Sequence, residues 1–585
     1  MTVTDPTSGS MSSNGMLRGH KRLRLVMAGF AMGLAVLVGK AGWLTIVEGG
    51  EGQQHARSGP EPRIPRPNIS DRYGHTLAAD IPVSSLYADP AKMIDIDEAV
   101  ELLTGALPNL DARDLRRKLE NRKRRFVWIQ REVSPAEREL IHNMGIPGVG
   151  FRNETRRIYP MGNLAAHVLG AVDLDSKGIA GLEKYLDDQG ALYTASLADP
   201  TRAASMPAQT SIDVRVQHAV TDELAKAMAK FRAKAAAGIV LNAYTGEVLA
   251  LASLPDFSPN NPADALKSEN VNRVTAGVFE LGSIIKAVTF AMALDYGTAT
   301  LKSRYDARFP LVIGRARIND FHAQKRIMTV PEIFMHSSNI GTGKMALEVG
   351  EERHQAFLRK LGFFDRLQTE LPEAAKPLLP PRWGKLVTVT ASFGHGFAVQ
   401  PMQGAAVAAA LVNGGKLIPP TLLKRDVETA DALAEQVIKP STSADMRYLF
   451  RLNVTEGTAG KAEVPGYRVG GKTGTAEKVI KGRYSKDHRL TSFIGAFPMD
   501  DPKYVMLMML DEPKPLPETY GYATSGWNAV PTAGKVIARI APLLGVTPEF
   551  DEDSLKKLEK YKKERLKEQA KEAERAAALE GGTAR

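Results

Sequence analysis

Apolar and polar positions divide the chain into segments of different character. Residues 25–47 form one apolar run in which Lys40 is the only charged residue, and a membrane-spanning helix needs about 20 apolar residues. Residues 48–67 are polar and rich in Gly and Pro, which is typical of a linker. Residues 68–185 carry mixed helical and strand patterns, including a helical pattern over 97–107.

The pattern from residue 210 to about 544 predicts a larger α/β domain. Apolar runs at 239–242 and 247–253, joined by Ala243-Tyr244-Thr245-Gly246, predict a β-hairpin. Segments 468–471, 491–496 and 504–510 are predicted as further strands of the same sheet. The stretch 190–209 has small residues, prolines and little periodicity, so it marks a boundary between domains.

The apolar run predicts an uncleaved membrane anchor. It is longer than the 7–15 residues typical of a signal peptide, and no Ala-x-Ala cleavage site follows it. Lys40 lies near its outer end, where a lysine can reach the interface. Four basic residues precede the run and place the N-terminus in the cytoplasm: Arg18, Lys21, Arg22 and Arg24.

We therefore expect five regions along the chain. They are a cytoplasmic tail (1–24), a transmembrane anchor (25–47), a first outer domain with its linkers (48–209), a second outer domain (210–550) and a charged helical tail (551–585). The tail is rich in Lys, Glu and Ala, as a solvated helix is.

Charge and cysteine usage exclude some classes of function. The net charge of +11 raises the question of nucleic acid, and the densest basic cluster runs from Arg113 to Arg131. That cluster has the pattern of an amphipathic helix leading into a strand, and no nucleic-acid-binding motif accompanies it, so we interpret it as a solvated face. The chain has no cysteine, which excludes disulfides, thiolate metal sites and thiol catalysis.

The first candidate for catalysis is a Ser-x-x-Lys motif at the start of an apolar helix. Residues 281–297 predict a short buried helix that begins near Ser283 and ends at Gly297. Lys286 is the only charged side chain in its first three turns and shares a face with Ser283. An apolar setting favours the neutral amine, which can accept a proton from serine. The same pattern at Ser554–Lys557 has no such setting.

Two further motifs follow in chain order. Ser337-Ser338-Asn339 precedes a helical pattern at 344–349, and Lys472-Thr473-Gly474-Thr475 follows the strand-like segment 467–471. A Ser and an Asn two positions apart can point together into a cleft, where Ser337 relays a proton and Asn339 holds a peptide amide. Together with Ser-x-x-Lys, these motifs form the set found in serine β-lactamases and penicillin-binding proteins.

The third motif offers a binding surface for a peptide substrate. Lys472 on a strand attracts a terminal carboxylate, which Thr473 and Thr475 can bind through their hydroxyls. Gly474 lets a substrate backbone approach the strand closely. The backbone N–H groups of Ser283 and Thr475 are then expected to form an oxyanion hole.

The chain resembles the class B penicillin-binding proteins, which are membrane-anchored D,D-transpeptidases of the cell wall, and it is most similar to the division-specific, septal type. The resemblance covers nearly all of the chain after the anchor. Pro67 and Leu281 depart from the family's pattern. Besides the three motifs, the segments that carry the resemblance are Ile69-Ser70-Asp71-Arg72, Arg156-Arg157-Ile158-Tyr159-Pro160, Gly178–Glu183, Thr210-Ser211-Ile212-Asp213, Phe279-Glu280-Leu281-Gly282-Ser283, Ser392-Phe393-Gly394-His395-Gly396 and Pro465–Lys478.

The resemblance implies an α/β (α+β) architecture. Residues 210–550 would form a transpeptidase domain with the β-lactamase-like penicilloyl-serine-transferase fold, an antiparallel sheet flanked by helices. Residues 48–209 would form a pedestal domain of the dimerisation type. The implied catalytic residues are Ser283, Lys286, Ser337, Asn339 and Lys472, and the implied substrate-binding residues are Thr473, Gly474 and Thr475. No metal, cofactor or nucleic acid is expected.

The resemblance also implies a cellular role. It predicts cross-linking of peptidoglycan stem peptides at the septum, inhibition by β-lactams, and an inner-membrane protein with one span and a periplasmic catalytic domain. Expected partners are a SEDS-family glycosyltransferase and other division proteins. The alternatives are an elongation-type transpeptidase, a β-lactamase or β-lactam sensor, and a β-lactam-binding scaffold of the division machinery with little turnover.

Overall fold

The structure is a computed structural model that describes residues 66–189 and 208–550, together with Met32 and isolated positions between 552 and 574. Apart from Met32, the predicted anchor lies outside the described residues, and so does most of the predicted C-terminal tail. Within the described ranges no helix combines the length and apolarity that a membrane crossing requires. The described chain forms two compact units, one of residues 82–155 and one of residues 66–81 and 156 onward.

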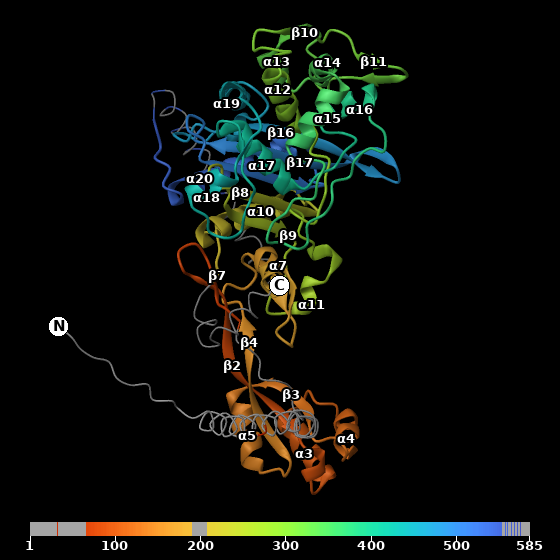
Figure 1. Ribbon diagram of the computed structural model, residues 1–585, viewed down its shortest axis with the longest axis vertical. Coiled ribbons are helices and arrows are strands. Elements are labelled where there is room, and N and C mark those ends of the chain that lie inside the picture. Colours follow the sequence, from red (N-terminus) through yellow and green to blue (C-terminus); the bar gives the residue numbers. More distant parts are fainter. Residues whose placement is uncertain are drawn as a thin grey trace, which may run out of the picture. The chain divides into compact units, whose positions relative to one another are not determined.

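The smaller unit is a sheet with three helices (Figure 1). Strand β2 (Thr76–Ala88) pairs with β3 (Val127–Val133) and with β4 (Val149–Ile158). The helices are α3 (Ile96–Ala106), α4 (Ala112–Glu120) and α5 (Pro135–Met144). The helical pattern predicted over 97–107 is confirmed, and Asp95 caps α3 by accepting from two backbone N–H groups of its first turn.

Helix α4 shows why the basic cluster is amphipathic. Leu115 and Leu119 are buried in the core of the smaller unit, while the arginines between them are exposed. The chain then passes through the exposed loop 121–125 into β3, as the pattern predicted.

The larger unit is built on one antiparallel sheet with strand order β16-β17-β18-β8-β9. Its strands are β8 (Ala235–Asn242), β9 (Val248–Leu254), β16 (Gly470–Ile480), β17 (Arg483–Phe497) and β18 (Tyr504–Asp511). The predicted β8–β9 hairpin is confirmed, and the three later strands join the same sheet. Several strand boundaries differ from the prediction. The strand predicted over 468–471 begins at Gly470, because Arg468 has a left-handed φ of 42° that an extended strand does not accept. Strands β17 and β8 begin earlier than predicted, at Arg483 instead of 491 and at Ala235 instead of 239.

Helices cover both faces of this sheet, because successive strand residues point to opposite sides. On one face, α10 (Val214–Lys230) and α20 (Ala529–Leu543) share a core with Val240 and Met508. On the other face lie α12 (Ile285–Asp295), α14 (Asn339–Val349), α17 (Pro401–Val412) and α19 (Pro440–Thr455). The predicted α/β architecture, an antiparallel sheet flanked by helices, is confirmed (Figure 1).

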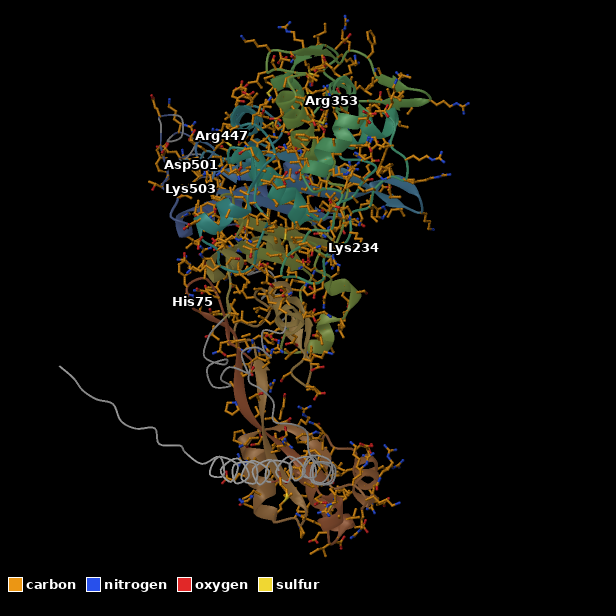
Figure 2. All side chains as sticks on the ribbon, in the orientation of Figure 1. His75, Lys234, Arg353, Arg447, Asp501 and Lys503 are labelled. Atoms are coloured by element: carbon orange, nitrogen blue, oxygen red, sulfur yellow. The ribbon has the colours of Figure 1, made fainter. Side chains whose placement is uncertain are left out.

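Shorter elements complete the larger unit. The helices are α6 (Ala166–Leu169), α7 (Gly181–Asp188), α11 (Pro262–Ala265), α13 (Val330–Met335), α15 (Glu351–Lys360), α16 (Lys385–Ser392) and α18 (Val427–Leu433). The strands are β1 (Ile69–Ser70), β5 (Ala171–Val172), β6 (Gly178–Ala180), β7 (Ala208–Gln209), β10 (Arg304–Asp306), β11 (Leu311–Ile313), β12 (Ala316–Ile318), β13 (Ile327–Thr329), β14 (Lys416–Leu417) and β15 (Glu435–Gln436). Charged side chains such as Lys234, Arg353, Asp501 and Lys503 are exposed on its surface (Figure 2).

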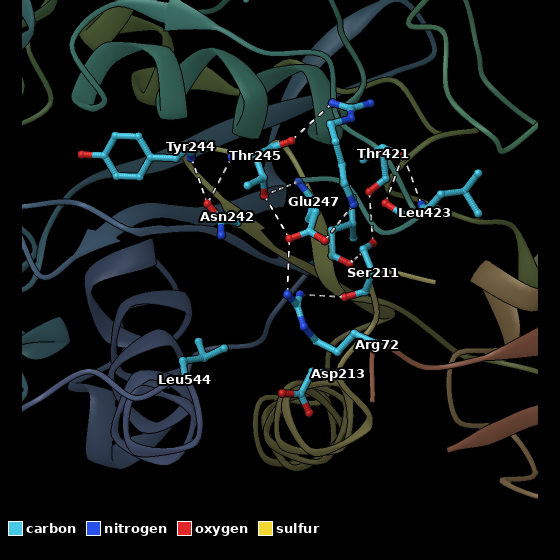
Figure 3. A network of polar contacts seen from close by, with 12 residues as sticks. Arg72, Ser211, Asp213, Asn242, Tyr244, Thr245, Glu247, Thr421, Leu423 and Leu544 are labelled. Carbon is cyan, nitrogen blue, oxygen red and sulfur yellow. Dashed lines mark hydrogen bonds and ion pairs between the residues drawn. The ribbon is translucent and has the colours of Figure 1, made fainter. Parts of the chain in front are cut away.

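Two polar networks tie residues 66–81 to the rest of the larger unit. Arg72 lies 3.4 Å from the Glu247 carboxylate and donates to the Ser211 carbonyl. Figure 3 shows these contacts as dashed lines. The second network is fully buried: Glu183 accepts from Arg66 at 2.8 Å and from Arg157 at 2.7 Å. Its buried cations are thus each paired with a carboxylate, as buried charges require.

Candidate active site

Ser283 lies at the entrance to a buried helix. It sits in a 3-10 turn, Gly282–Ile284, that leads directly into α12, so the predicted helix is confirmed. The helix ends at Asp295, and Gly297 adopts a left-handed φ of 71°, which stops it. The Gly282 N–H donates to the Gly394 carbonyl at 3.3 Å, which holds the turn against the loop of the Phe393-Gly394-His395 segment.

Lys286 is fully buried one turn after Ser283. Its ammonium group donates to the backbone carbonyl of Ser337 and, at 3.1 Å, to the Ser337 hydroxyl. Among the described residues no hydrogen bond joins Lys286 to Ser283; the helix brings them to neighbouring positions, and the bonds of the lysine go to the second motif. Ser283 itself is half-buried and so remains accessible to a substrate.

Ser337 lies between two buried amines. Its backbone has a left-handed φ of 55°, and its hydroxyl accepts from Lys472 at 3.1 Å as well as from Lys286. Lys472 is also fully buried and contacts the Thr473 carbonyl at 3.3 Å. Within residues 66–189 and 208–550 neither lysine forms an ion pair. Lys286 and Lys472, which are 51 and 135 positions from Ser337 in the chain, thus both contact the Ser337 hydroxyl oxygen.

Burial changes the charge state of both lysines. It lowers the pKa of Lys286 well below the ordinary value, and the charge of Lys472 lowers it further, while Asp320 acts in the opposite direction. Burial lowers the pKa of Lys472 to about 7. The site therefore holds neutral amine near neutral pH, and a neutral amine can accept the proton of a serine hydroxyl.

The second motif is fastened by a residue that the sequence did not single out. Asp320 accepts from the Ser338 hydroxyl at 2.7 Å and from the Ile340 N–H at 2.9 Å. Ser338 caps α14, and Asn339 donates from its side chain to the Asn319 carbonyl at 3.0 Å. No sequence signal marks Asp320, because it belongs to a loop whose contact with the motif exists only in the folded chain.

The third motif lies on strand β16 at the edge of the sheet. Among the residues that the structure describes, this strand pairs with β17 on one side only, which leaves its other side available to an extended substrate. A Cβ at Gly474 would overlap the Ser492 hydroxyl and lie 2.8 Å from the Leu281 carbonyl, so only glycine fits here. The Thr475 hydroxyl accepts from the Ser525 N–H at 3.2 Å.

Thr458 is a second residue that sequence reasoning missed. Its hydroxyl lies 2.8 Å from that of Thr473 and orients it. Asn453 accepts from Thr458 at 3.1 Å and donates to the Gly471 carbonyl at 2.8 Å, which fixes the start of β16. The eight predicted site residues thus lie on the 3-10 turn Gly282–Ile284, on α12, on α14 and on β16, with Ser337 in the short link just before the α14 cap, Ser338.

This arrangement is suited to acyl transfer by a serine. It combines an accessible hydroxyl, a buried amine of lowered pKa one turn along the same helix and a strand edge that can align a peptide. In the described part of the chain, no group of three or more His, Asp or Glu residues is placed to hold a metal ion.

Comparisons with known proteins agree with this chemistry. Residues 236–535 match the penicillin-binding protein transpeptidase domain, and residues 63–189 match the penicillin-binding protein dimerisation domain. The chain is 41% identical to the probable peptidoglycan D,D-transpeptidase FtsI of Caulobacter vibrioides, over 90% of this chain and 89% of that protein. It is 28% identical to the peptidoglycan D,D-transpeptidase FtsI of Escherichia coli K12, over 90% of this chain and 92% of that protein.

A solved structure shares the fold. The crystal structure of penicillin-binding protein 3 from Mycobacterium tuberculosis, complexed with aztreonam, superposes with a TM-score of 0.63 at 23% identity, covering 84% of this chain and 98% of that one. The two matched domains, their order and the extent of the similarity to FtsI lead to one conclusion: the chain belongs to the class B penicillin-binding proteins.

Proposed function

We propose that this protein is a septal peptidoglycan D,D-transpeptidase that works through an acyl-enzyme on Ser283 and is a target of β-lactams. The observation that carries the assignment of roles is the pair of buried lysines that share the Ser337 hydroxyl, each at 3.1 Å. Two buried cations so close together and without a carboxylate partner repel one another, so one amine is held neutral and can act as a base.

In the first half-reaction Ser283 attacks the carbonyl carbon of the penultimate D-Ala of a donor stem peptide. Lys286 accepts the hydroxyl proton as the Ser283 oxygen bonds to that carbon. The backbone N–H groups of Ser283 and Thr475 hold the oxyanion. The peptide bond then breaks, and the terminal D-Ala leaves with a proton relayed from Lys286 through the Ser337 hydroxyl to its amine.

In the second half-reaction an amine of a neighbouring stem peptide attacks the acyl-enzyme. The same base takes the proton of that amine, the new peptide bond forms, and the Ser283 oxygen regains a proton as it leaves. Lys472, Thr473 and Thr475 hold the donor's terminal carboxylate before cleavage, and Asn339 holds a backbone amide. A β-lactam enters the first half-reaction as a donor and stays attached.

The septal assignment rests on the relatives named FtsI. The proposal includes one inner-membrane anchor over 25–47, an N-terminus in the cytoplasm and a catalytic domain in the periplasm, which rest on the basic residues and the apolar run of the sequence. It also includes a SEDS-family glycosyltransferase that supplies nascent glycan strands. An elongation role is the alternative.

The chemical test is covalent labelling with a fluorescent penicillin. The native chain should be labelled, Ser283→Ala should not be labelled while it stays folded, and mass spectrometry of a digest should place the adduct on Ser283. Labelling of Ser283→Ala at a normal rate would contradict the assignment. Rapid loss of the label from the native chain would instead indicate a β-lactamase.

The cellular test is depletion. A septal enzyme should leave cells that grow into filaments without dividing. Cells that round up or lose control of width while still dividing would show an elongation enzyme and leave the acyl-transfer chemistry intact.

A further inference from the structure

The smaller unit contains a cavity of about 600 Å³ that the acyl-transfer reaction does not use. Its volume lies within the range of pockets that hold small ligands or peptide side chains. It is lined by residues of β2, β4 and the segments beside them, with Tyr87, Phe126 and Phe151 among them. All of its lining residues belong to residues 82–155, so the cavity belongs to this unit by itself.

One wall of the cavity is aromatic. The rings of Tyr87 and Phe126 are stacked, with centroids 4.9 Å apart and planes 18° apart. Trp128 packs edge-on against Phe126 at 4.7 Å, which fixes the orientation of that ring. Gly150 leaves the Tyr87 ring uncovered, because a Cβ there would lie 2.9 Å from the ring. A rigid aromatic surface of this kind favours a large apolar or flat group.

The rim of the cavity is cationic. Lys92, Arg125 and Arg152 line it, and the buried Asp89 holds Arg125 at 3.2 Å. Asp89 is the only carboxylate among the residues that line the cavity. The rim therefore presents more positive than negative charge to whatever enters.

The loop that leads into the cavity adds to this field. Arg122, Lys123 and Arg124 precede Arg125 directly, and all are exposed. Within the described ranges these three form no ion pair, in contrast to Arg116, Arg117 and Lys118 on α4, which pair with Asp97 and Asp114. Adjacent unpaired cations attract an anionic partner and increase its rate of association.

We propose that this cavity is a docking site for an acidic protein segment in which a large apolar side chain is flanked by carboxylates. The apolar side chain stacks on Tyr87 and Phe126, and the carboxylates pair with Arg125 and with the cations of loop 122–124. A peptide of this kind satisfies both halves of the site. An anionic lipid surface would use the cations and leave the aromatic wall unused, and a neutral sugar would use the rings and leave the cations unpaired.

The test is binding of a labelled synthetic peptide, with one tryptophan flanked by glutamates, to the full-length protein in detergent. Two variants remove one half of the site each: Arg122→Glu with Arg124→Glu reverses charge on the loop, and Phe126→Ala removes the stacked ring. Each should weaken binding by about tenfold or more, and added salt should weaken binding to the native chain. Lys302→Glu, an exposed lysine of the larger unit, is the matched control and should bind as the native chain does.

Three results would overturn the proposal. The first is equal binding of the peptide by the native chain and by both variants. The second is that a peptide with glutamine in place of each glutamate binds the native chain as tightly as the acidic peptide. The third is competition by phosphatidylglycerol vesicles that depends on loop 122–124 but not on Phe126. Penicillin labelling is measured alongside and should be unchanged in the variants. This site is therefore tested separately from the acyl-transfer reaction, and limited proteolysis reports whether the smaller unit of each variant is folded.

Discussion

The protein buries basic side chains in two places, and their pKa values are shifted in opposite directions. In the network of Arg66, Arg157 and Glu183, each arginine has a carboxylate within 2.8 Å. Burial works against the charged form of Arg157, but Glu183 and Asp80 outweigh it and raise its pKa. Lys286 and Lys472 are buried as deeply and form no ion pair with any described carboxylate, so burial lowers the pKa of both.

The pKa values of the buried arginines and lysines differ because of their carboxylate partners and not because of how deeply they are buried. A paired buried cation stays charged and contributes to structure, whereas an unpaired one loses its proton and becomes a base. This explains why arginines form the paired network and lysines form the catalytic pair: arginine stays protonated in proteins, whereas burial readily lowers the pKa of lysine. Four substitutions test this contrast.

Replacement of the unpaired base should have the largest effect. Lys286→Met should lower the rate of penicillin acylation by about 10²–10⁴-fold, because it removes the proton acceptor while filling a similar volume. It should change stability little, because the two hydrogen bonds lost to Ser337 are offset by replacing a buried amine, which has no ion pair among the described residues, with an apolar group. Stopped-flow labelling and urea unfolding measure the two effects, with exposed Lys302→Met as the control. Acylation at a near-native rate would mean that a group other than Lys286 accepts the proton of the Ser283 hydroxyl.

The paired network should respond in the opposite way. Glu183→Gln keeps the shape but leaves two buried arginines without their shared carboxylate, which should destabilise the larger unit by about 3–5 kcal/mol. Exposed Glu352→Gln on α15 should change stability by less than about 0.5 kcal/mol. Urea unfolding measures both. A similar small change in the two variants would mean that the network does not depend on charge pairing.

The pH dependence of stability sharpens the contrast for Lys472. In the unfolded chain this lysine keeps its proton up to the ordinary pKa of 10.5, whereas in the folded chain it releases the proton near pH 7. Between these values the unfolded state binds more protons, so the contribution of Lys472 to the free energy of unfolding rises with pH. Below about pH 7 both states are protonated and the contribution is constant.

Lys472→Met should remove this rise. The difference in unfolding free energy between the native chain and the variant should therefore change across the window from about pH 7 to 10.5 and be flat below it. Urea unfolding at a series of pH values measures this difference. A difference that does not vary with pH would show that Lys472 stays charged.

The smallest effect should come from Asp320, the carboxylate whose charge raises the pKa of Lys286. Asp320→Asn loses the charge that raises the pKa of Lys286 and one of two hydrogen bonds to residues 338–340. Acylation should fall by about tenfold, and the pH at which it reaches half its maximum should move downward. Exposed Asp501→Asn is the control. A lower rate without a shift of the pH profile would limit Asp320 to a structural role.

Much of the site could be predicted because most of its residues belong to short sequence motifs. Ser283 and Lys286 are neighbours on one helix, and Lys472–Thr475 are consecutive on one strand, so local spacing already places them. Asp320 and Thr458 could not be predicted, because each acts on the motifs through hydrogen bonds to residues more than ten positions away in the chain.

The fold was predictable to a similar extent and for the same reason. The β8–β9 hairpin is local and has a clear apolar pattern, whereas its pairing with β18 joins segments more than 250 residues apart. The start of β16 was placed too early because apolar periodicity does not report that Arg468 takes a left-handed conformation. The roles of the site residues, the domain boundaries and the membrane anchor stay predictions.

The close packing around the nucleophile has an evolutionary consequence. Gly474 and Gly394 enclose the turn of Ser283, and a Cβ at either would overlap neighbouring atoms, with backbone atoms of Gly282 or Leu281 among those too close. Backbone cannot move aside as a flexible side chain can, so a substitution at either glycine would disable cell-wall synthesis together with drug binding. Bacteria under β-lactam selection gain nothing from such a change. Heritable resistance in this protein has to arise at positions that tolerate substitution. Inhibitors that contact these two glycines bind the part of the site that tolerates substitution least.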